Sequence, residues 1–205
     1  MNFPSAIPVL KTMRLRLRPY TPADASEVQR LAGESEVAET TAAIPHPYPD
    51  GAAEAWIATH ATKWNAHQEL IFAITLKTTG QLIGSIGLVL LPTDQKAELG
   101  YWIGVPYWNQ GYASEAAQAV IEHGFRILGL NRIQAHHMAS NSASGRVMEK
   151  AGMTREGRSP QAIKKGGKFH DTIFYGVVRS DWSELPESLP SIPGLDDNDL
   201  RESDR

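Results

Sequence analysis

The residues best suited to chemistry form a strand-to-helix junction that comprises Trp108, Asn109, Gln110, Gly111, Tyr112, Ala113 and Ser114. They follow the apolar, strand-like segment Leu99–Val105 and lead into a helical pattern that begins near Ala113. The first N–H groups of a helix have no partner within it, and the helix dipole adds partial positive charge there. Gly111 lets the backbone approach a ligand closely, and Ala113 and Ser114 keep the mouth of the turn open. The junction is therefore predicted to bind a phosphate or pyrophosphate.

Two helices are predicted beyond this junction. The first carries an apolar stripe at helical spacing and ends near Gly129; the stripe comprises Ala117, Val120, Ile121, Gly124, Phe125 and Leu128. An extended segment, Arg132–Met138, comes next. Asn141 then stands where it can cap a second, shorter helix that ends near Gly152.

This order of elements resembles the GNAT superfamily of N-acetyltransferases, and within it the RimJ/RimL-like branch that acetylates the N-terminal residues of ribosomal proteins. The resemblance runs from Thr12 to Trp182 and rests on the junction together with Thr12–Pro19, Ala97–Ile103, the Asn141-x-x-Ser144 pair, Val147–Met153, and His170-Asp171 followed by Tyr175. Trp108 departs from the pattern, because the superfamily usually has Gln or Arg there. The turn works mainly through backbone amides, so we discount this difference.

The resemblance implies a set of roles for these residues. Acetyl-CoA would be the cosubstrate and no metal would be needed. The diphosphate would lie on the junction, in contact with Trp108, Gln110, Gly111, Tyr112, Ala113 and Ser114. Trp102 and Ile103 would offer main-chain contacts to the pantetheine amides, and Asn141 would face the pantetheine arm. The acceptor would be a protein N-terminus or a small amine.

Bulk properties narrow the class of protein. The formal charge of −3 argues against a nucleic-acid scaffold. The absence of cysteine excludes disulfides, thiolate metal sites and a cysteine nucleophile. Charges from Lys11 onward interrupt any signal-peptide-like stretch, and no apolar run approaches the length of a membrane span. We therefore expect a cytoplasmic protein with no membrane or nucleic-acid partner, and the oligomeric state is left open, a homodimer included.

The predicted fold is α/β, a single GNAT domain with a mixed, twisted sheet flanked by helices. The length fits one domain over residues 1–183, followed by an acidic, proline-containing tail over 184–205 that lacks apolar periodicity. Strands are predicted at Met13–Arg18, Leu70–Leu76, Gln81–Leu91, Ala97–Val105, Arg132–Met138 and Phe169–Val178, and helices from Thr21 to about Ala32 and over Ala52–Trp64. The alternating arginines of the first strand are interpreted as a solvated face, and Lys164–Lys168 as a hairpin turn rather than a phosphate loop.

Glu98 is the leading candidate for the general base. It lies on the strand that enters the junction, between Ala97 and Leu99, where partial burial would raise its pKa toward a useful range. The resemblance also places a base on this strand. Alternation along a strand does not decide which face a side chain takes, so two alternatives stay open: Glu98 points to solvent, or it pairs with a basic group on a neighbouring strand.

Ser144 is the candidate for protonating the departing thiolate. The resemblance makes its hydroxyl the nearest one to the sulfur; its alternative role is to form hydrogen bonds at the start of the helix. Many members of the superfamily use a tyrosine for this step. The sequence has no tyrosine at the matching place just after Asn141.

Histidines and loop residues supply weaker candidates. His46 and Tyr48 lie in the proline-containing loop Thr40–Asp50, which such folds place over the acceptor, and His170 is assigned to packing or to the acceptor side. His136 and His137 are adjacent on a strand and so face opposite ways, which argues against a zinc pair.

The sequence favours one function over three others. The leading interpretation is acetyl transfer from acetyl-CoA to the N-terminal α-amine of a protein, by direct attack in a ternary complex. The same chemistry on an amino acid, polyamine or antibiotic is the second, and a non-catalytic acyl-CoA-binding module is the third. Nucleotide binding is disfavoured, because no acidic ribose-binding residue follows a Gly-x-Gly-x-x-Gly pattern.

Overall fold

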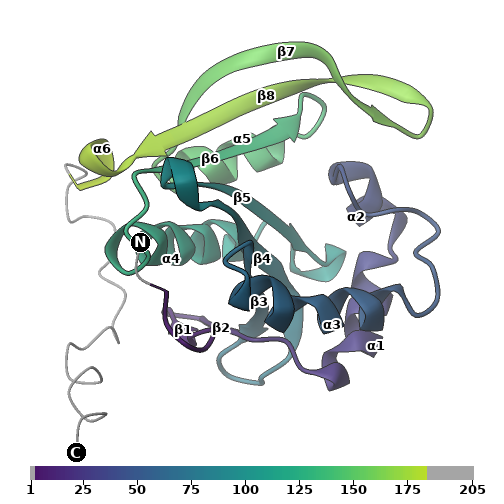
Figure 1. Ribbon diagram of the computed structural model, residues 1–205. Helices are drawn as coiled ribbons and strands as arrows, with labels where there is room; N and C mark the ends of the chain where they lie inside the picture. Colours follow the sequence, from purple (N-terminus) through teal and green to yellow (C-terminus); the bar gives the residue numbers. More distant parts are fainter. Residues whose placement is uncertain (1–2, 184–205) are drawn as a thin grey trace, which may run out of the picture.

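One mixed sheet organises the protein, which is described here over residues 3–183 of a computed structural model (Figure 1). The strands lie in the order β1-β2-β3-β4-β5-β6-β8-β7. Their bounds are β1 Leu10–Lys11, β2 Leu15–Arg18, β3 Glu69–Leu76, β4 Leu82–Leu91, β5 Lys96–Ile103, β6 Arg132–Met138, β7 Thr154–Lys165 and β8 Lys168–Val178. The helices are α1 Ala25–Ala32, α2 Ser35–Thr40, α3 Ala52–Asn65, α4 Tyr112–Arg126, α5 Ser142–Lys150 and α6 Arg179–Ser183. The predicted α/β class is confirmed.

The sheet opens between β5 and β6. All other neighbouring strands run antiparallel, whereas these two run parallel and pair over three positions, Lys96–Glu98 with Arg132–Gln134. Beyond Glu98 the strands separate, and β6 continues its pairing with β8 up to Met138. The second half of β5 therefore keeps β4 as a neighbour on one edge and has none on the other.

Helices cover the two faces of the sheet unequally. Helix α4 packs on β2, β4, β5 and β6, and α5 packs on β6, β7 and β8. Helices α1 and α3 pack on β4 and β3. Ala97, Leu99 and Ile103 belong to the larger core beneath α4, so the alternating residues of β5 face the opposite side of the sheet. We call these the α4 face and the α3 face.

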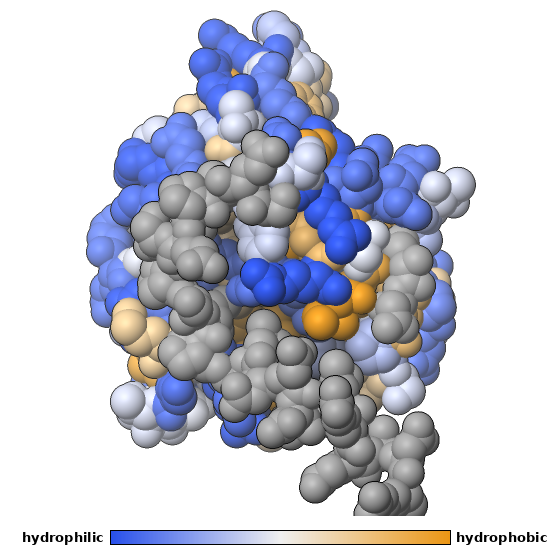
Figure 2. All heavy atoms as spheres, turned by 90° about the vertical axis from the view of Figure 1, so that its left-hand side faces the viewer, coloured by the Kyte–Doolittle hydropathy of each residue, from blue (hydrophilic) through white to orange (hydrophobic). Residues whose placement is uncertain are grey.

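Most of the predicted elements are confirmed within one or two residues, including the helix that follows the junction and the hairpin at Lys164–Lys168. Helix α2 was not predicted. The predicted tail over 184–205 lies outside the described residues. No helix in residues 3–183 is long and apolar enough to cross a membrane. Among the coloured residues on the face seen in Figure 2, hydrophilic residues predominate and hydrophobic residues show between them.

The interpretation of the first-strand arginines as a solvated face is correct for Arg16 alone. Arg16 is exposed, whereas Arg14 and Arg18 are half-buried. The Arg18 guanidinium forms two hydrogen bonds to Asp24, of 2.8 and 2.7 Å. Although burial raises the pKa of Asp24, the hydrogen bond from Arg18 lowers it, and the net pKa lies below its ordinary value. The pair therefore attaches the strand to the start of the first helical segment.

Two histidines are buried, and within residues 3–183 their ring nitrogens have no hydrogen-bond partner. His60 of α3 is 5% exposed and His123 of α4 is 3% exposed. Burial lowers the pKa of each imidazole to about 4. Both rings are therefore neutral in the folded protein near pH 7, where they pack as apolar groups.

These rings make stability depend on pH. Between about pH 6.5 and pH 4 these histidines are protonated in the unfolded chain but stay neutral in the folded protein. The free energy of unfolding therefore falls as the pH drops through this window. We expect His123→Leu to lose about 2 kcal/mol less stability than the wild type between pH 7 and pH 5. Urea unfolding at the two pH values measures the difference. Equal losses in the two proteins would contradict a neutral, buried His123.

Candidate functional site

A cavity of about 570 Å³ occupies the opening between β5 and β6. The diverging ends of the two strands, the junction before α4, the start of α5 and the loop after α2 line it, together with residues of α3, β3, β4 and β7. The cavity reaches both faces of the sheet, because Tyr101 lines it from the α4 face and Trp102 from the α3 face.

The junction presents a row of free amides to this cavity. Asn109 and Gly111 have positive φ angles of 59° and 81°, which turn the chain sharply into α4. Within residues 3–183, no backbone N–H from Asn109 to Ser114 donates to a protein acceptor, and the first amide of this helix to do so is that of Glu115, to Gly111 O at 3.1 Å. Five of these six residues line the cavity, and Gln110, which was predicted to contact the diphosphate, does not. Such a row of unpaired donors at a helix N-terminus suits the oxygens of a diphosphate.

Arg14 and Glu115 fix the junction to the first strands. Arg14 donates to Gln110 O at 2.9 Å and to the Glu115 carboxylate at 2.6 Å, and Thr12 donates to the same carboxylate at 2.5 Å. Burial raises the pKa of Glu115, but the hydrogen bonds from Thr12 and Arg14 outweigh it, so the net pKa is lowered. The ionised pair holds the turn in place, and the Arg14 guanidinium adds positive charge beside it.

The residues whose main-chain groups lie on the open edge of β5 differ from those predicted from the sequence. Gly104 N donates to Ile83 O at 2.9 Å, which fixes the alternation of hydrogen bonds along the β4–β5 pair. The main-chain N–H and C=O groups of Trp102 therefore point toward β4, and those of Tyr101 and Ile103 point toward the cavity. The main-chain groups of Trp102, predicted to face the cofactor, are therefore directed at β4, and those of Tyr101 lie on the open edge instead. The Ile103 carbonyl accepts from the Trp108 indole at 2.6 Å, so only the Ile103 N–H remains free.

Asn141 and Ser144 lie where the sequence predicted, at the start of α5. Asn141 caps the helix, because its side-chain oxygen accepts from Ser144 N at 3.1 Å. Its amide nitrogen also donates to Thr40 O at 3.0 Å, which ties α5 to the end of α2. Both residues line the cavity.

Tyr101 is a candidate functional residue that the sequence analysis did not select. Its hydroxyl lies 2.8 Å from Ser144 Oγ and 3.1 Å from Ser144 O. Burial raises the pKa of Tyr101, so the phenol keeps its proton. The alternation of β5 places Tyr101 on the face of Leu99 and Ile103, which was the available signal. The pair of hydroxyls can donate a proton into the opening between β5 and β6.

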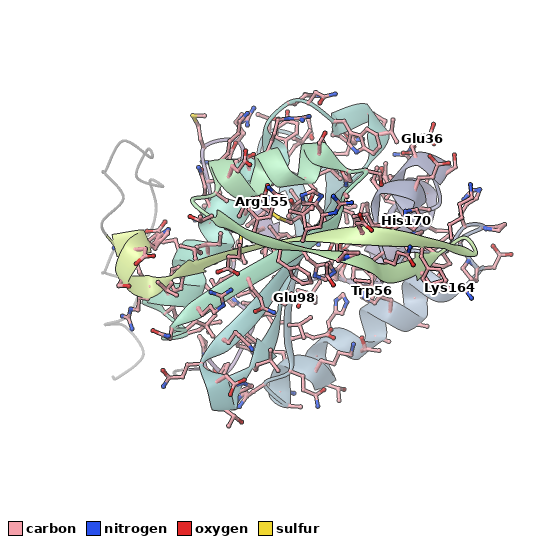
Figure 3. All side chains as sticks on the ribbon, turned by 90° about the horizontal axis from the view of Figure 1, so that it is seen from above. Glu36, Trp56, Glu98, Arg155, Lys164 and His170 are labelled. Carbon is pink, nitrogen blue, oxygen red and sulfur yellow. The ribbon has the colours of Figure 1, made fainter. Side chains whose placement is uncertain are left out.

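Glu98 lines the cavity from the α3 face and pairs with a base on the neighbouring strand. Its carboxylate lies 3.1 Å from His136 Nδ1 and accepts from Gln134 Nε2 at 3.3 Å. Figure 3 shows Glu98 and Trp56 on the side of the β7–β8 hairpin away from α5. The hydrogen bond from His136 outweighs burial and lowers the pKa of Glu98. The expectation of a raised pKa was therefore wrong, because its partner could not be read from the sequence.

Two glycines make the floor of the cavity beside Glu98. Gly87 of β4 and Gly100 of β5 are cross-strand partners, and their neighbouring pairs are Val89 with Glu98 and Ser85 with Trp102. A side chain on Gly87 would meet Leu70 O at 2.5 Å, whereas one on Gly100 would meet nothing within 4 Å. The open space above Gly100 is thus part of the cavity.

The loop after α2 contributes residues other than the predicted ones. Thr40–Ile44 line the cavity, whereas His46, Tyr48 and His170 do not. Lys165 at the hairpin tip donates to the carbonyls of Thr41 and of Ile44, the latter at 2.9 Å. These contacts and the Asn141 bond draw the start of the loop over the cavity, and the proline-containing part is left outside it. The structure therefore places His46, Tyr48 and His170 outside the lining of this cavity, and an acceptor-side role for them stays a prediction.

Among residues 3–183, no three His, Asp or Glu side chains are close enough together to hold a metal ion. His136 and His137 face opposite sides of β6, as the alternation predicted, and His137 is buried beneath α5 next to Tyr175. The site thus combines a row of amide donors, a hydroxyl pair on one face of the sheet and a carboxylate–imidazole pair on the other.

Comparison with known proteins gives consistent matches. Residues 14–154 match the family described as acetyltransferase (GNAT) domain. A Bacillus subtilis protein named Uncharacterized N-acetyltransferase YoaA is 33% identical over 173 residues, which is 84% of this chain and 97% of that protein. The Putative ribosomal N-acetyltransferase YdaF of the same species is 32% identical over 104 residues, or 50% of this chain and 57% of that protein. The structure of Mycobacterium smegmatis RimJ in complex with CoA-disulfide has a TM-score of 0.77 at 20% identity and covers 93% of each chain.

Proposed function

The chain belongs to the GNAT acetyltransferase family and is an N-acetyltransferase, and we propose that it transfers the acetyl group of acetyl-CoA to the N-terminal α-amine of a protein of the ribosomal type. One observation carries the choice of acceptor. Among the described residues that line the cavity, Glu98 is the only acidic one. A single carboxylate complements one ammonium group, whereas a polyamine with several charges would leave the others without partners.

The comparisons support the same choice at a coarser level. The relative YdaF is named a putative ribosomal N-acetyltransferase, and the structural neighbour RimJ was solved with a CoA derivative. Acetyl-CoA supplies an acetyl group already activated as a thioester. A free α-amine has a pKa of about 8, so near neutral pH it needs only modest help to lose its proton. That demand fits a site with weakly basic groups.

We assign the chain's residues to the parts of this reaction by their positions. The free amides of the junction hold the diphosphate, and Arg14 fixes the junction through its hydrogen bond to Gln110 O. The Tyr101 and Ile103 N–H groups on the open edge of β5 orient the pantetheine arm. The Tyr101–Ser144 hydroxyl pair delivers a proton to the departing sulfur on the α4 face. The acceptor enters over Gly100 on the α3 face, beside Glu98.

A panel of acceptors tests the proposal directly. Release of CoA from acetyl-CoA is measured with N-terminal peptides of ribosomal proteins, with the same peptides bearing blocked N-termini, and with lysine and spermidine. We expect turnover with the free N-terminal peptides and none with the blocked ones. Turnover with a small amine and with no peptide would contradict the proposed acceptor and leave the enzyme class intact.

Arg14 provides a test of the diphosphate seat. Because Arg14 fixes the Gln110 carbonyl and adds positive charge next to the amides, Arg14→Gln should weaken CoA binding about tenfold, as expected for loss of a hydrogen bond to a charged group. Arg16→Gln, two residues further along the chain and exposed on β2, is the matched control and should leave CoA affinity unchanged. Isothermal titration with CoA gives both values. Equal affinity in the two variants would place the diphosphate elsewhere.

Gly100 provides a test of the acceptor path. A side chain at Gly100 would enter open space without meeting protein atoms, so Gly100→Val should fold normally and fill the floor of the cavity. We expect the KM for the acceptor to rise about tenfold or more, the loss expected when about one good contact is blocked, with CoA affinity unchanged. Gly157→Val, at an exposed strand glycine with open space around it, is the control. An unchanged KM in Gly100→Val would show that the acceptor does not cross this surface.

A further inference from the structure

We propose that His136 takes the proton from the acceptor amine. Glu98 is then a positioning residue that orients the His136 ring and stabilises its protonated form. This inference rests on the proposed acetyl transfer to an amine, and it assigns the base within the same site. It replaces Glu98, the base expected from the sequence, with a residue of the neighbouring strand.

The geometry gives Glu98 a supporting place. One carboxylate oxygen faces His136 Nδ1 at 3.1 Å, and the other accepts from Gln134 Nε2 at 3.3 Å. Both partners come from β6, since Glu98 and Gln134 are aligned in the last position where the strands pair. His136 is two residues further along, where β6 has left β5, so its ring borders the opening itself.

The contact with Glu98 decides which nitrogen of His136 is basic. A carboxylate can only accept, so the neutral ring carries its proton on Nδ1 and leaves the lone pair on Nε2. Among the described residues, none forms a hydrogen bond with His136 Nε2. The side chain is 30% exposed and lines the cavity. Nε2 is therefore the lone pair that an incoming amine can reach.

The electrostatics assign the proton to the imidazole. The hydrogen bond from His136 keeps the pKa of Glu98 below its ordinary value, so this carboxylate is a poor proton acceptor near neutral pH. The same contact raises the pKa of His136 in spite of burial, which brings it closer to that of an α-amine. Lys96 on β5 acts on Glu98, and the residue facing His136 from β8 is the uncharged Phe174, with the ring centroids 5.8 Å apart.

The proton balance closes with these groups. The amine nitrogen forms a bond to the acetyl carbonyl carbon as the carbon–sulfur bond breaks, and the nitrogen passes one proton to His136 Nε2. The Tyr101–Ser144 pair gives one proton to the sulfur. His136 then returns its proton to solvent and the hydroxyl pair recovers one, so the net products are an amide and a thiol.

Four variants test the assignment: His136→Gln, Glu98→Gln, the double variant, and His67→Asn as a control at an exposed histidine outside the cavity. We expect His136→Gln to lower kcat/KM about 100-fold and to abolish the rise of activity with pH that belongs to the imidazole. Glu98→Gln should lower it about tenfold and shift that rise to lower pH, and the double variant should be no worse than His136→Gln. The control should match the wild type, and CoA binding should be unchanged in all four.

The second readout needs no acceptor. Titration of the imidazole resonances in the free protein should show a raised pKa for His136 in the wild type and a lower one in Glu98→Gln. Turnover with a small amine alone would overturn the proposed acceptor without changing these titrations. A Glu98→Gln variant that loses more activity than His136→Gln, or a His136 pKa that does not respond to Glu98→Gln, would overturn the inference.

Discussion

The separation of β5 from β6 is the constraint on which the rest of the structure depends. Two parallel strands that pair over three positions and then diverge leave main-chain groups of β5 without a strand partner. A protein interior does not tolerate such groups unless water or a ligand satisfies them. The opening therefore becomes a cavity, and the residues that border it come from both faces of the sheet. Every candidate role described above follows from a position relative to this opening.

The surrounding structure keeps the opening from closing. Arg14, Thr12 and Glu115 fasten the junction to the first strands, which are remote in sequence and lie beyond β3 and β4 in the sheet. Asn141 and Lys165 fasten the loop after α2 from the other side. The contacts of Arg14, Glu115 and Lys165 are charge-assisted, which makes them stronger than hydrogen bonds between neutral groups such as that of Asn141. The site is thus held by its rim while its centre stays free of protein atoms.

Local signals predicted the elements, and distant contacts decided the roles. The junction, the Asn141 cap and the helical stripe of α4 could be read from the sequence because each depends on neighbours within a turn or two. The pairing of Glu98 with His136 depends on strand register across 38 residues, and that of Tyr101 with Ser144 spans 43. The path of the loop that carries His46 and Tyr48 could not be predicted for the same reason, since it is set by Asn141 and by Lys165 of the distant hairpin.

The sheet also divides the site into two compartments, and different structural elements line each of them. In the proposed function, helices α4 and α5 and the junction would hold the thioester, whereas β3, β4 and the loop after α2 would shape the space where the nitrogen arrives. Few residues belong to both sides. Substitutions on the acceptor side can therefore change which nucleophile binds while the thioester site stays intact. Proteins built on this scaffold can thus acquire new acceptors through point substitutions on one face of the sheet.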